Sequence, residues 1–313
     1  MFYFIFLLLL NIVCNYEVNA LENEHIEPVF EKLIEYVNQN PGFGWKAGIN
    51  SRFKNLKDTQ KLFRNNIKIK DSGGKQIQTI SHRNVNIVIP YSFDARDHWV
   101  NCSTIKHIHD ECCCRADWAF ATVDSISDRI CIYSNGCSHG NEIEVLMYWI
   151  VNGIVTGGSY EDQSGCQPYP FSKYPECKDV NYEFPVCTSE CQDGYNKTYE
   201  DDKFYGEQIY NVYDNQEDIQ KEILMNGPVI ASIFVKTDFL IYKSGVYLPT
   251  PRSSNLGWIN LRIIGWGYEG KTPYWLCANS WSKEWGDNGY VKVQRGIQAG
   301  YIESYVRAPI PKI

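Results

Sequence analysis

Cysteine is the residue that most constrains this chain, because twelve cysteines occur among its 313 residues. So many thiols are unusual in a reducing compartment unless they bind metal, and they are typical of proteins that fold where disulfides form. The N-terminus agrees with this, since residues 2–14 are apolar yet too few to span a bilayer, and small residues follow at 18–20. We therefore predict that 1–20 is a signal peptide, with a signal anchor as the alternative.

The remaining composition is that of a globular protein, with 44% hydrophobic residues, 21% charged residues and a formal net charge of -7. An acidic balance gives no electrostatic footprint for nucleic acid or an anionic membrane, so we expect neither as a partner once the leader is removed. The expected location is secreted or extracellular, or the lumen of a lysosome or vacuole. Sequons at Asn101 and Asn196 predict N-glycosylation on that route.

The segment 21–88 differs in pattern from the rest of the chain. Apolar residues with helical spacing predict an amphipathic helix over 22–37, on the face formed by Ile26, Val29, Phe30, Leu33, Ile34 and Val37. Residues 42–86 are polar, rich in Lys and Asn, and interrupted by two adjacent glycines. We expect this stretch to be a tether that contributes nothing to a core.

The rest of the chain is helical first and β-rich second. A buried helix is predicted over 118–132, where one face carries Trp118, Thr122, Val123, Ile126 and Ile130. Strands are predicted in the apolar runs 229–235, 259–267, 274–278 and 289–293, which Gly and Pro turns separate. This order indicates an α+β fold.

Four ordered segments resemble cathepsin B-like members of the papain family of cysteine peptidases. They are 45–48, 90–96, 127–132, and the composite run 272–276, 279–281 and 285–290. The resemblance implies a papain-like α+β fold for 89–313, preceded by a propeptide-like segment at 21–88. Its helical half would span about 89–205 and its β-barrel half about 206–313, with a substrate cleft between them.

The resemblance also identifies which residues occupy the catalytic positions. A papain-type enzyme uses a Cys thiolate at a helix N-terminus, a His base, an Asn that orients the His, and a Gln that helps to bind the oxyanion. The nucleophile position falls on Asp117, because 114–118 reads Cys-Arg-Ala-Asp-Trp where the family has Cys-Gly-Ser/Ala-Cys-Trp/Tyr. The Gln position, six residues earlier, falls on Glu111.

The barrel half supplies the other two positions. The His position lies six residues before Gly265 and falls on Ile259, and no histidine follows His139. Of the four catalytic positions, only that of the orienting Asn keeps the family's residue, at Asn279. A carboxylate at Glu111 repels an oxyanion, whereas the family's Gln amide donates a hydrogen bond to it. Losing one oxyanion donor raises the barrier of the reaction by about 2.7–4 kcal/mol. We therefore predict an inactive peptidase homologue with no cofactor.

The predicted role is binding at the cleft, whose expected residues are Gly140, Trp258 and Trp281. The expected partner is a protein or peptide, such as a protease inhibitor or an active relative, with the chain acting as a decoy, regulator or effector. Two other classes stay open: an active papain-family peptidase, and a structural protein that is crosslinked through extra thiols.

The sequence also offers residues for two rebuilt sites. Asp117 and Glu111 could form a carboxylate pair for acid–base chemistry, although Asp117 is more simply an anion at a helix N-terminus. His107, His109 and Cys112 could bind a metal, but they meet no zinc spacing rule and are more simply loop residues, so we predict no metal site.

Family connectivity implies the disulfides. The implied pairs are Cys102–Cys131, Cys114–Cys137, Cys166–Cys191 and Cys177–Cys187, which leave Cys112, Cys113 and Cys277 unpaired. Cys277 lies in a β-run and is expected to be buried and inert. The family's occluding loop corresponds to 166–191, where Lys178 and Asp179 stand at the positions of its paired histidines.

The substitutions also change the charge of the predicted cleft. Glu111 and Asp117 add negative charge without an obvious cation, with Arg115 between them in sequence. Close carboxylates raise each other's pKa unless a cation arrives, so we expect the cleft to prefer basic peptides. The alternative is a cleft closed by Trp258, Ile259 and a retained N-terminal segment. With no activity to restrain, we expect that segment to stay attached.

Overall fold

The structure is a computed structural model that describes residues 28–50, 52–53, 59, 63, 77–100, 102–111, 116–127, 142–158, 160, 163–169 and 188–312. The α-helices in these residues are α2 (Pro28–Asn38), α4 (Ala95–His98), α5 (Asp117–Ser127), α6 (Glu142–Asn152) and α7 (Gln216–Asn226). Short 3-10 helices are η1 (Pro41–Phe43), η2 (Ser103–Lys106), η4 (Thr237–Ile241) and η5 (Ala299–Tyr301). No helix within this part of the chain is long and apolar enough to cross a membrane.

The described strands form one mixed sheet of ten strands. They are β1 (Trp45–Ala47), β2 (Thr79–Ile80), β3 (Phe93–Asp94), β4 (Gly206–Val212), β5 (Val229–Lys236), β6 (Tyr242–Tyr247), β7 (Asn255–Glu269), β8 (Thr272–Ala278), β9 (Tyr290–Gln294) and β10 (Val306–Pro311). The order is β1-β6-β9-β8-β7-β5-β10-β4-β2, and β3 pairs with β7. Among the described strands β1 and β2 are the two edges, so closure into a barrel stays a prediction.

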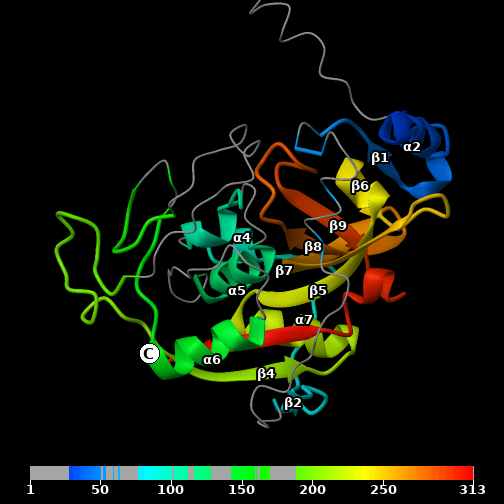
Figure 1. Cartoon of the computed structure of the whole chain (residues 1–313). Coiled ribbons are helices and arrows are strands. Elements are labelled where there is room, and N and C mark those ends of the chain that lie inside the picture. Colours follow the sequence, from blue (N-terminus) through cyan, green and yellow to red (C-terminus); the bar gives the residue numbers. More distant parts are fainter. Residues whose placement is uncertain are drawn as a thin grey trace, which may run out of the picture.

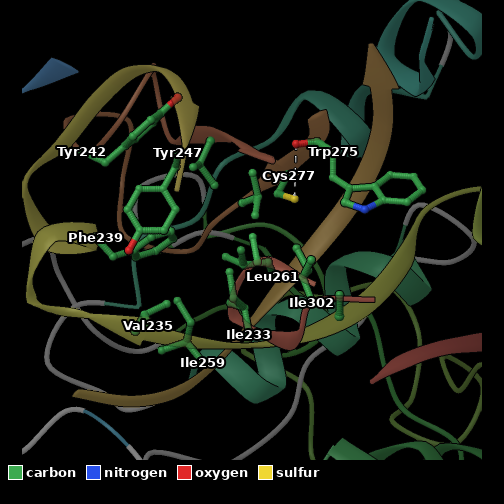
Figure 2. Packing of buried hydrophobic residues seen from close by; sticks show 14 of the residues in the cluster. Ile233, Val235, Phe239, Tyr242, Tyr247, Ile259, Leu261, Trp275, Cys277 and Ile302 are labelled. Carbon is green, nitrogen blue, oxygen red and sulfur yellow. Dashed lines mark hydrogen bonds between the residues drawn. The ribbon is translucent and has the colours of Figure 1, made fainter. Parts of the chain in front are cut away.

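The strand β7 separates two hydrophobic cores because its side chains alternate between its faces. Ile259 and Leu261 lie in the main cluster together with Cys277 of β8, as Figure 2 shows. Ile264 lies in another cluster with Ile105, which precedes α5 in the chain. In Figure 1 the helices α4, α5 and α6 lie on one side of the sheet's central strands, which fits an α+β fold.

A buried arginine joins the helical half to β7. The Arg262 side chain is 1% exposed. Its Nη2 donates to the His107 carbonyl at 3.1 Å, and its Nη1 donates to the Asp124 carbonyl in α5 at 3.3 Å. Buried charged hydrogen bonds of this kind fix geometry, so α5 is held against β7 near Asp124.

The predicted helix of the N-terminal segment is present as α2, Pro28–Asn38. Its buried side chains are Phe30, Leu33 and Val37. Val29 is 43% exposed, so its assignment to the apolar face was wrong, because the face that contacts the sheet is narrower than the sequence pattern. The residues 22–27 of the predicted helix lie outside the described part.

The prediction that 42–86 is a tether was wrong, because this stretch contributes to the main core. Trp45, Phe53 and Phe63 are each at most 5% exposed and belong to the main cluster. The Trp45 ring packs on Tyr247 at 5.4 Å, and β1 pairs with β6. The aromatic residues are far apart in a polar stretch, so its average composition conceals them.

The end of the same segment is also anchored. The strand β2 pairs in parallel with β4. The His82 ring Nε2 lies 2.7 Å from Oε2 of the buried Glu222, which also accepts from the Tyr210 hydroxyl at 2.7 Å. The His82 N–H donates to Asp218. The N-terminal segment is therefore held along most of its described length.

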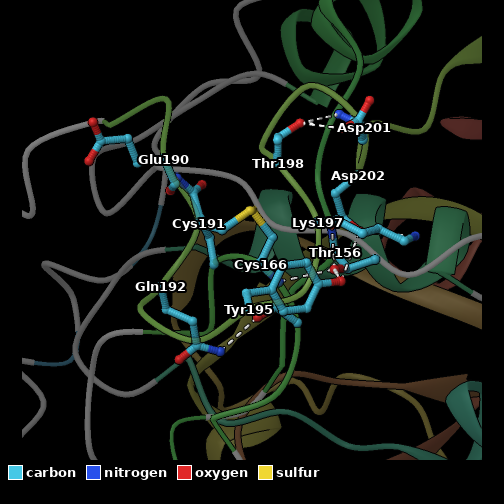
Figure 3. Close-up of a disulfide and its surroundings, with 12 residues drawn as sticks. Thr156, Cys166, Glu190, Cys191, Gln192, Tyr195, Lys197, Thr198, Asp201 and Asp202 are labelled. Carbon is cyan, nitrogen blue, oxygen red and sulfur yellow. Dashed lines mark hydrogen bonds and ion pairs between the residues drawn. A yellow bond between two sulfur atoms is a disulfide. The ribbon is translucent and has the colours of Figure 1, made fainter.

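The predicted disulfide between Cys166 and Cys191 is confirmed, and Figure 3 shows its surroundings. Next to it, Oδ2 of the buried Asp202 accepts from the Thr156 hydroxyl at 2.5 Å, and Oδ1 accepts from the Tyr195 hydroxyl at 2.8 Å. The disulfide and the Asp202 carboxylate thus lie side by side, and the carboxylate links Thr156 to Tyr195. Such a crosslink contributes on the order of 2–4 kcal/mol.

The other cysteine predictions have mixed outcomes. Cys102 is free in the structure and packs half-buried against the cluster around Ala95 and Ile105, which differs from the implied pairing with Cys131. Cys277 is buried as predicted, and burial raises the pKa of its thiol. The remaining predicted disulfide cysteines, with Cys112 and Cys113, lie outside the described residues.

Candidate functional site

The residue predicted at the nucleophile position begins helix α5. The Asp117 side chain is 4% exposed, and its Oδ2 accepts from the backbone N–H of Asn260 in β7 at 2.8 Å. The Asn260 side-chain Nδ2 lies 3.4 Å from the same oxygen. A carboxylate at a helix N-terminus is favoured by the helix dipole. The site therefore has a hydrogen-bonded carboxylate where α5 meets β7.

The residue that faces Asp117 is Asn260, and sequence reasoning missed it. Ile259, the predicted His position, is 2% exposed and packs in the main cluster opposite Ile233 (Figure 2). The next residue points to the other face, and its Oδ1 accepts from the Ser232 hydroxyl at 2.7 Å. A lone Asn inside an apolar strand run was the signal for this contact.

Glu111 is held from several sides. Its backbone N–H donates to the Ser280 carbonyl at 2.9 Å, and its own carbonyl accepts from the Tyr169 hydroxyl at 3.1 Å. Its Oε1 accepts from Trp281 Nε1 at 2.9 Å and lies 3.3 Å from Arg52 Nη2. Its Oε2 is buried without a hydrogen-bond partner among the described residues.

The environment of Glu111 shifts its protonation. Burial raises the pKa of this carboxyl well above its ordinary value, the Arg52 charge lowers it, and the Asp117 charge raises it. A smaller rise comes from the Asp110 charge. The Asp117 charge therefore acts on Glu111, while their use as an acid–base pair stays a prediction, and Arg52 is the cation that sequence reasoning missed.

Asn279, the retained family residue, is 3% exposed. Its Oδ1 accepts from the Ser280 N–H at 2.9 Å, whereas its Nδ2 has no hydrogen-bond partner among the described residues. Leaving a buried donor unpaired costs about 1–3 kcal/mol, so an orienting amide persists here at a cost.

The N-terminal segment covers this site. The Phe53 ring meets Trp281 edge to face with 4.8 Å between ring centroids, and Phe63 meets it at 5.9 Å. The Arg52 Nη1 lies 2.6 Å from Asp110 Oδ1. Residues of this segment therefore contact Trp281 and the carboxylates, whereas Trp258 and Ile259, which the alternative also placed in the closure, pack elsewhere. Whether the segment stays attached remains a prediction.

The other predicted site residues do not join this group. Trp258 is half-buried and packs on Phe234 and Tyr305, at 5.3 Å and 5.4 Å between ring centroids. Gly140, Asn101, Arg115, Lys178 and Asp179 lie outside the described residues. Asn196 is exposed in a loop, and its glycosylation stays a prediction.

The alternative metal ligands do not form a cluster within the described residues. His109 Nε2 lies 2.9 Å from Asp124 Oδ1, and the ring centroids of His107 and His109 are 4.2 Å apart. No group of three potential ligands occurs in the part of the chain that is described, and Cys112 lies outside it. Burial lowers the pKa of His107, while the neighbouring histidine charge lowers that of Asp124 against the effect of its burial.

The comparisons with known proteins agree with this architecture. Residues 133–310 match the family described as papain family cysteine protease, and the chain belongs to that family. Within it, a cathepsin B-like cysteine proteinase of Schistosoma japonicum is 40% identical over 324 residues, covering 94% of each chain. The cathepsin B-like cysteine proteinase 6 of Caenorhabditis elegans is 34% identical over 340 residues, covering 97% of this chain and 89% of that protein.

A solved structure supports the arrangement of the N-terminal segment. The structure of procathepsin B S9 from Trypanosoma congolense has a TM-score of 0.76 and 31% identity, covering 90% of this chain and 98% of that one. Because it is a proform, it supports assigning 21–88 as a propeptide-like segment.

Proposed function

We propose that this chain is a secreted, cathepsin B-like protein that binds a protein or peptide ligand at its cleft and does not cleave it. The observation that carries the proposal is the Asp117 carboxylate at the start of α5, hydrogen-bonded by Asn260. A papain-type reaction needs a thiolate at that position and an imidazole to exchange its proton. A carboxylate with Ile259 in the hydrophobic core supplies neither group.

Two further features support a binding role. The buried Glu111 carboxylate stands at the position of an oxyanion donor, where negative charge disfavours the reaction. Asn279 has no histidine to orient, because Ile259 stands at that position, and its Oδ1 accepts instead from the Ser280 N–H at 2.9 Å. A decoy for protease inhibitors or a regulator of active relatives would need a papain-like fold and no turnover.

The second candidate function is a working cysteine peptidase. It is favoured by the relatives, which are named as cysteine proteinases at up to 40% identity. Such an enzyme would need a nucleophile other than Asp117, and Cys112, Cys113 and Cys114 are the nearest thiols in sequence. This candidate predicts turnover that survives the loss of Asp117.

A peptidase assay separates the two candidates. The purified protein, both as the full chain and after proteolytic removal of the N-terminal segment, is assayed with dipeptidyl substrates and labelled with a papain-family epoxide. We expect neither turnover nor labelling, and we expect Asp117→Cys alone to stay inactive because Ile259 cannot accept a proton. Turnover that is lost with Asp117→Ala would refute the binding role. Turnover that is lost on alkylating thiols would favour the second candidate.

A further inference from the structure

We infer that Asp110 and Glu111 form a receptor for an arginine side chain, and that the protein's ligand is a peptide segment in which an arginine is followed by an aromatic residue. The inference names the ligand class of the proposed binding site and rests on that proposal for the cleft being a binding surface. Arg52 and Phe53 of the N-terminal segment now occupy the receptor.

The geometry of the ion pairs defines the receptor. Arg52 Nη1 lies 2.6 Å from Asp110 Oδ1, and Arg52 Nη2 lies 3.3 Å from Glu111 Oε1. Two nitrogens of one planar guanidinium thus meet two different carboxylates. Arginine suits this arrangement because its donors have fixed directions, whereas lysine offers a single charged centre. The Arg52 side chain is 9% exposed, so the pair is largely withdrawn from water.

A cation in the receptor favours the ionised form of Glu111, because burial raises the pKa of this carboxyl and the Arg52 charge lowers it. Asp117 adds a third carboxylate, whose charge acts on Glu111. The buried Glu111 Oε2 accepts no hydrogen bond from the described residues. Leaving a buried carboxylate oxygen without a hydrogen bond costs free energy. A ligand that donates to Oε2 therefore makes a favourable contact that Arg52 does not make. The site therefore favours cationic donors over neutral ones.

The neighbouring contact specifies the aromatic residue. Phe53 follows Arg52 directly, and its ring meets Trp281 edge to face at 4.8 Å. The Trp281 indole N–H donates to the same Glu111 oxygen that faces Arg52. Such aromatic pairs contribute beyond their buried area. The indole therefore links the charged and the apolar parts of the receptor, and removing Arg52 frees the charged part.

The N-terminal segment acts as a competitor in the same molecule. A tethered group has an effective concentration in the millimolar range, so it weakens the apparent affinity of an added peptide. Removing the Arg52 guanidinium removes the competing charge while the strand pairing of β1 still holds the segment on the protein. The Arg52→Ala protein should therefore bind an arginine peptide more tightly than the wild type.

Titration calorimetry of the full chain tests the inference. The probes are acetyl-Arg-Phe-amide and, as the matched neutral peptide, acetyl-Gln-Phe-amide. We expect Arg52→Ala to bind the arginine peptide at least about tenfold more tightly than the wild type. The exposed Arg83→Ala removes the same charge from the same segment and should match the wild type. Adding Glu111→Gln to Arg52→Ala should abolish the gain. Arg52→Gln, which keeps a long side chain, replaces Arg52→Ala if the alanine variant does not fold.

Three outcomes would overturn the inference. They are equal binding of the two peptides, no gain in the Arg52 variants, or a gain that survives Glu111→Gln. Assaying the same preparations for turnover keeps the two proposals distinguishable. Turnover without arginine preference refutes both, whereas arginine preference with turnover leaves the receptor intact and refutes only the non-catalytic role.

Discussion

At the scale of single residues, Asp117 is a buried anion whose position is explained by its hydrogen bonds. Its Oδ2 satisfies the Asn260 N–H at 2.8 Å, in a strand where most other donors pair along the sheet. A buried N–H that loses its acceptor costs about 1–3 kcal/mol. The carboxylate therefore stabilises the contact between α5 and β7, whatever its chemical role.

This argument predicts the stability of two variants. Asp117→Ala should lower the free energy of unfolding by about 1–3 kcal/mol, because the Asn260 N–H is left without an acceptor. Asp117→Asn should cost less, since it keeps an acceptor oxygen and removes a charge beside Glu111. Urea unfolding of the three proteins measures the difference. An alanine variant as stable as the wild type would show that this hydrogen bond contributes nothing.

Glu111 gives a pH-dependent prediction. Burial holds its folded pKa above the unfolded value, with Arg52 lowering it and Asp117 and Asp110 raising it. The unfolded chain therefore releases this proton at lower pH than the folded protein. The contribution of Glu111 to stability is fully present below the unfolded pKa and is lost as the pH rises toward the folded pKa.

Glu111→Gln does not titrate, so its stability relative to the wild type should increase as the pH rises through that window. Urea unfolding at several pH values between the acidic range and neutrality measures the trend. The control is Glu190→Gln, whose side chain is exposed. A difference between Glu111→Gln and the wild type that stays constant with pH would contradict the direction of the shift.

The sequence could predict part of this residue-scale picture. The resemblance to the family placed Asp117, Glu111 and Trp281 near one another. It could do so because these residues lie in two short stretches, 111–118 and 279–281, that match the family's spacing. The contact between Asn260 and Asp117 could not be predicted, because it requires knowing which face of β7 each residue occupies. An error of one residue in that assignment places the side chain on the opposite face. The position of Arg52 beside Glu111 could not be predicted either, because the polar segment that carries it has no periodic pattern from which its path could be inferred.

At the scale of secondary structure, the docking of the N-terminal segment depends on one glycine. Strand β1 pairs with β6 at Trp45 and Gly245. Gly245 has φ +88°, and a Cβ there would lie 2.5 Å from the Gly44 carbonyl oxygen and 2.7 Å from the Trp45 Cα. The close approach of the two backbones therefore requires a residue without a side chain.

Gly245→Ala should release β1 from β6 in addition to straining the backbone. The matched control is Gly270→Ala, because Gly270 has φ +59° with nothing within 4 Å of the added Cβ. Each substitution should cost about 1–2 kcal/mol of backbone strain. Only Gly245→Ala should also accelerate limited proteolysis within 28–80. Equal proteolysis of both variants would show that strain alone explains the effect.

Element predictions succeeded where apolar residues are consecutive. The strands β5, β7, β8 and β9 were predicted, because their buried runs give a strong signal. The strands β4, β6 and β10 were missed, since β4 and β6 contain polar residues and β10 contains two prolines. The short strands β1, β2 and β3 depend on partners far away in sequence, which a local pattern does not reveal.

At the scale of the whole molecule, one hydrophobic core includes both the N-terminal segment and the β-rich half. Phe30 and Val37 of α2 and Trp45 of β1 belong to the same cluster as Ile259 and Trp275. Burying one such side chain contributes about 1.5–3 kcal/mol as an upper estimate. The segment is therefore a structural part of this protein, which the reading of 42–86 as a tether did not anticipate.

The last prediction follows from this shared core. A chain that begins near Ile89 loses the apolar contacts of α2 and β1, and exposes the rings of Tyr242 and Tyr247 that pack on Trp45. It should unfold at a lower temperature than the full chain and bind hydrophobic dyes, because each lost side chain removes about 1.5–3 kcal/mol at most. N-terminal sequencing of the protein from its native source should find chains that retain 28–80. Native chains that begin only near Ile89 and match the full chain in thermal stability would contradict the prediction. They would mean that the β-rich half reorganises to cover its own aromatic surface.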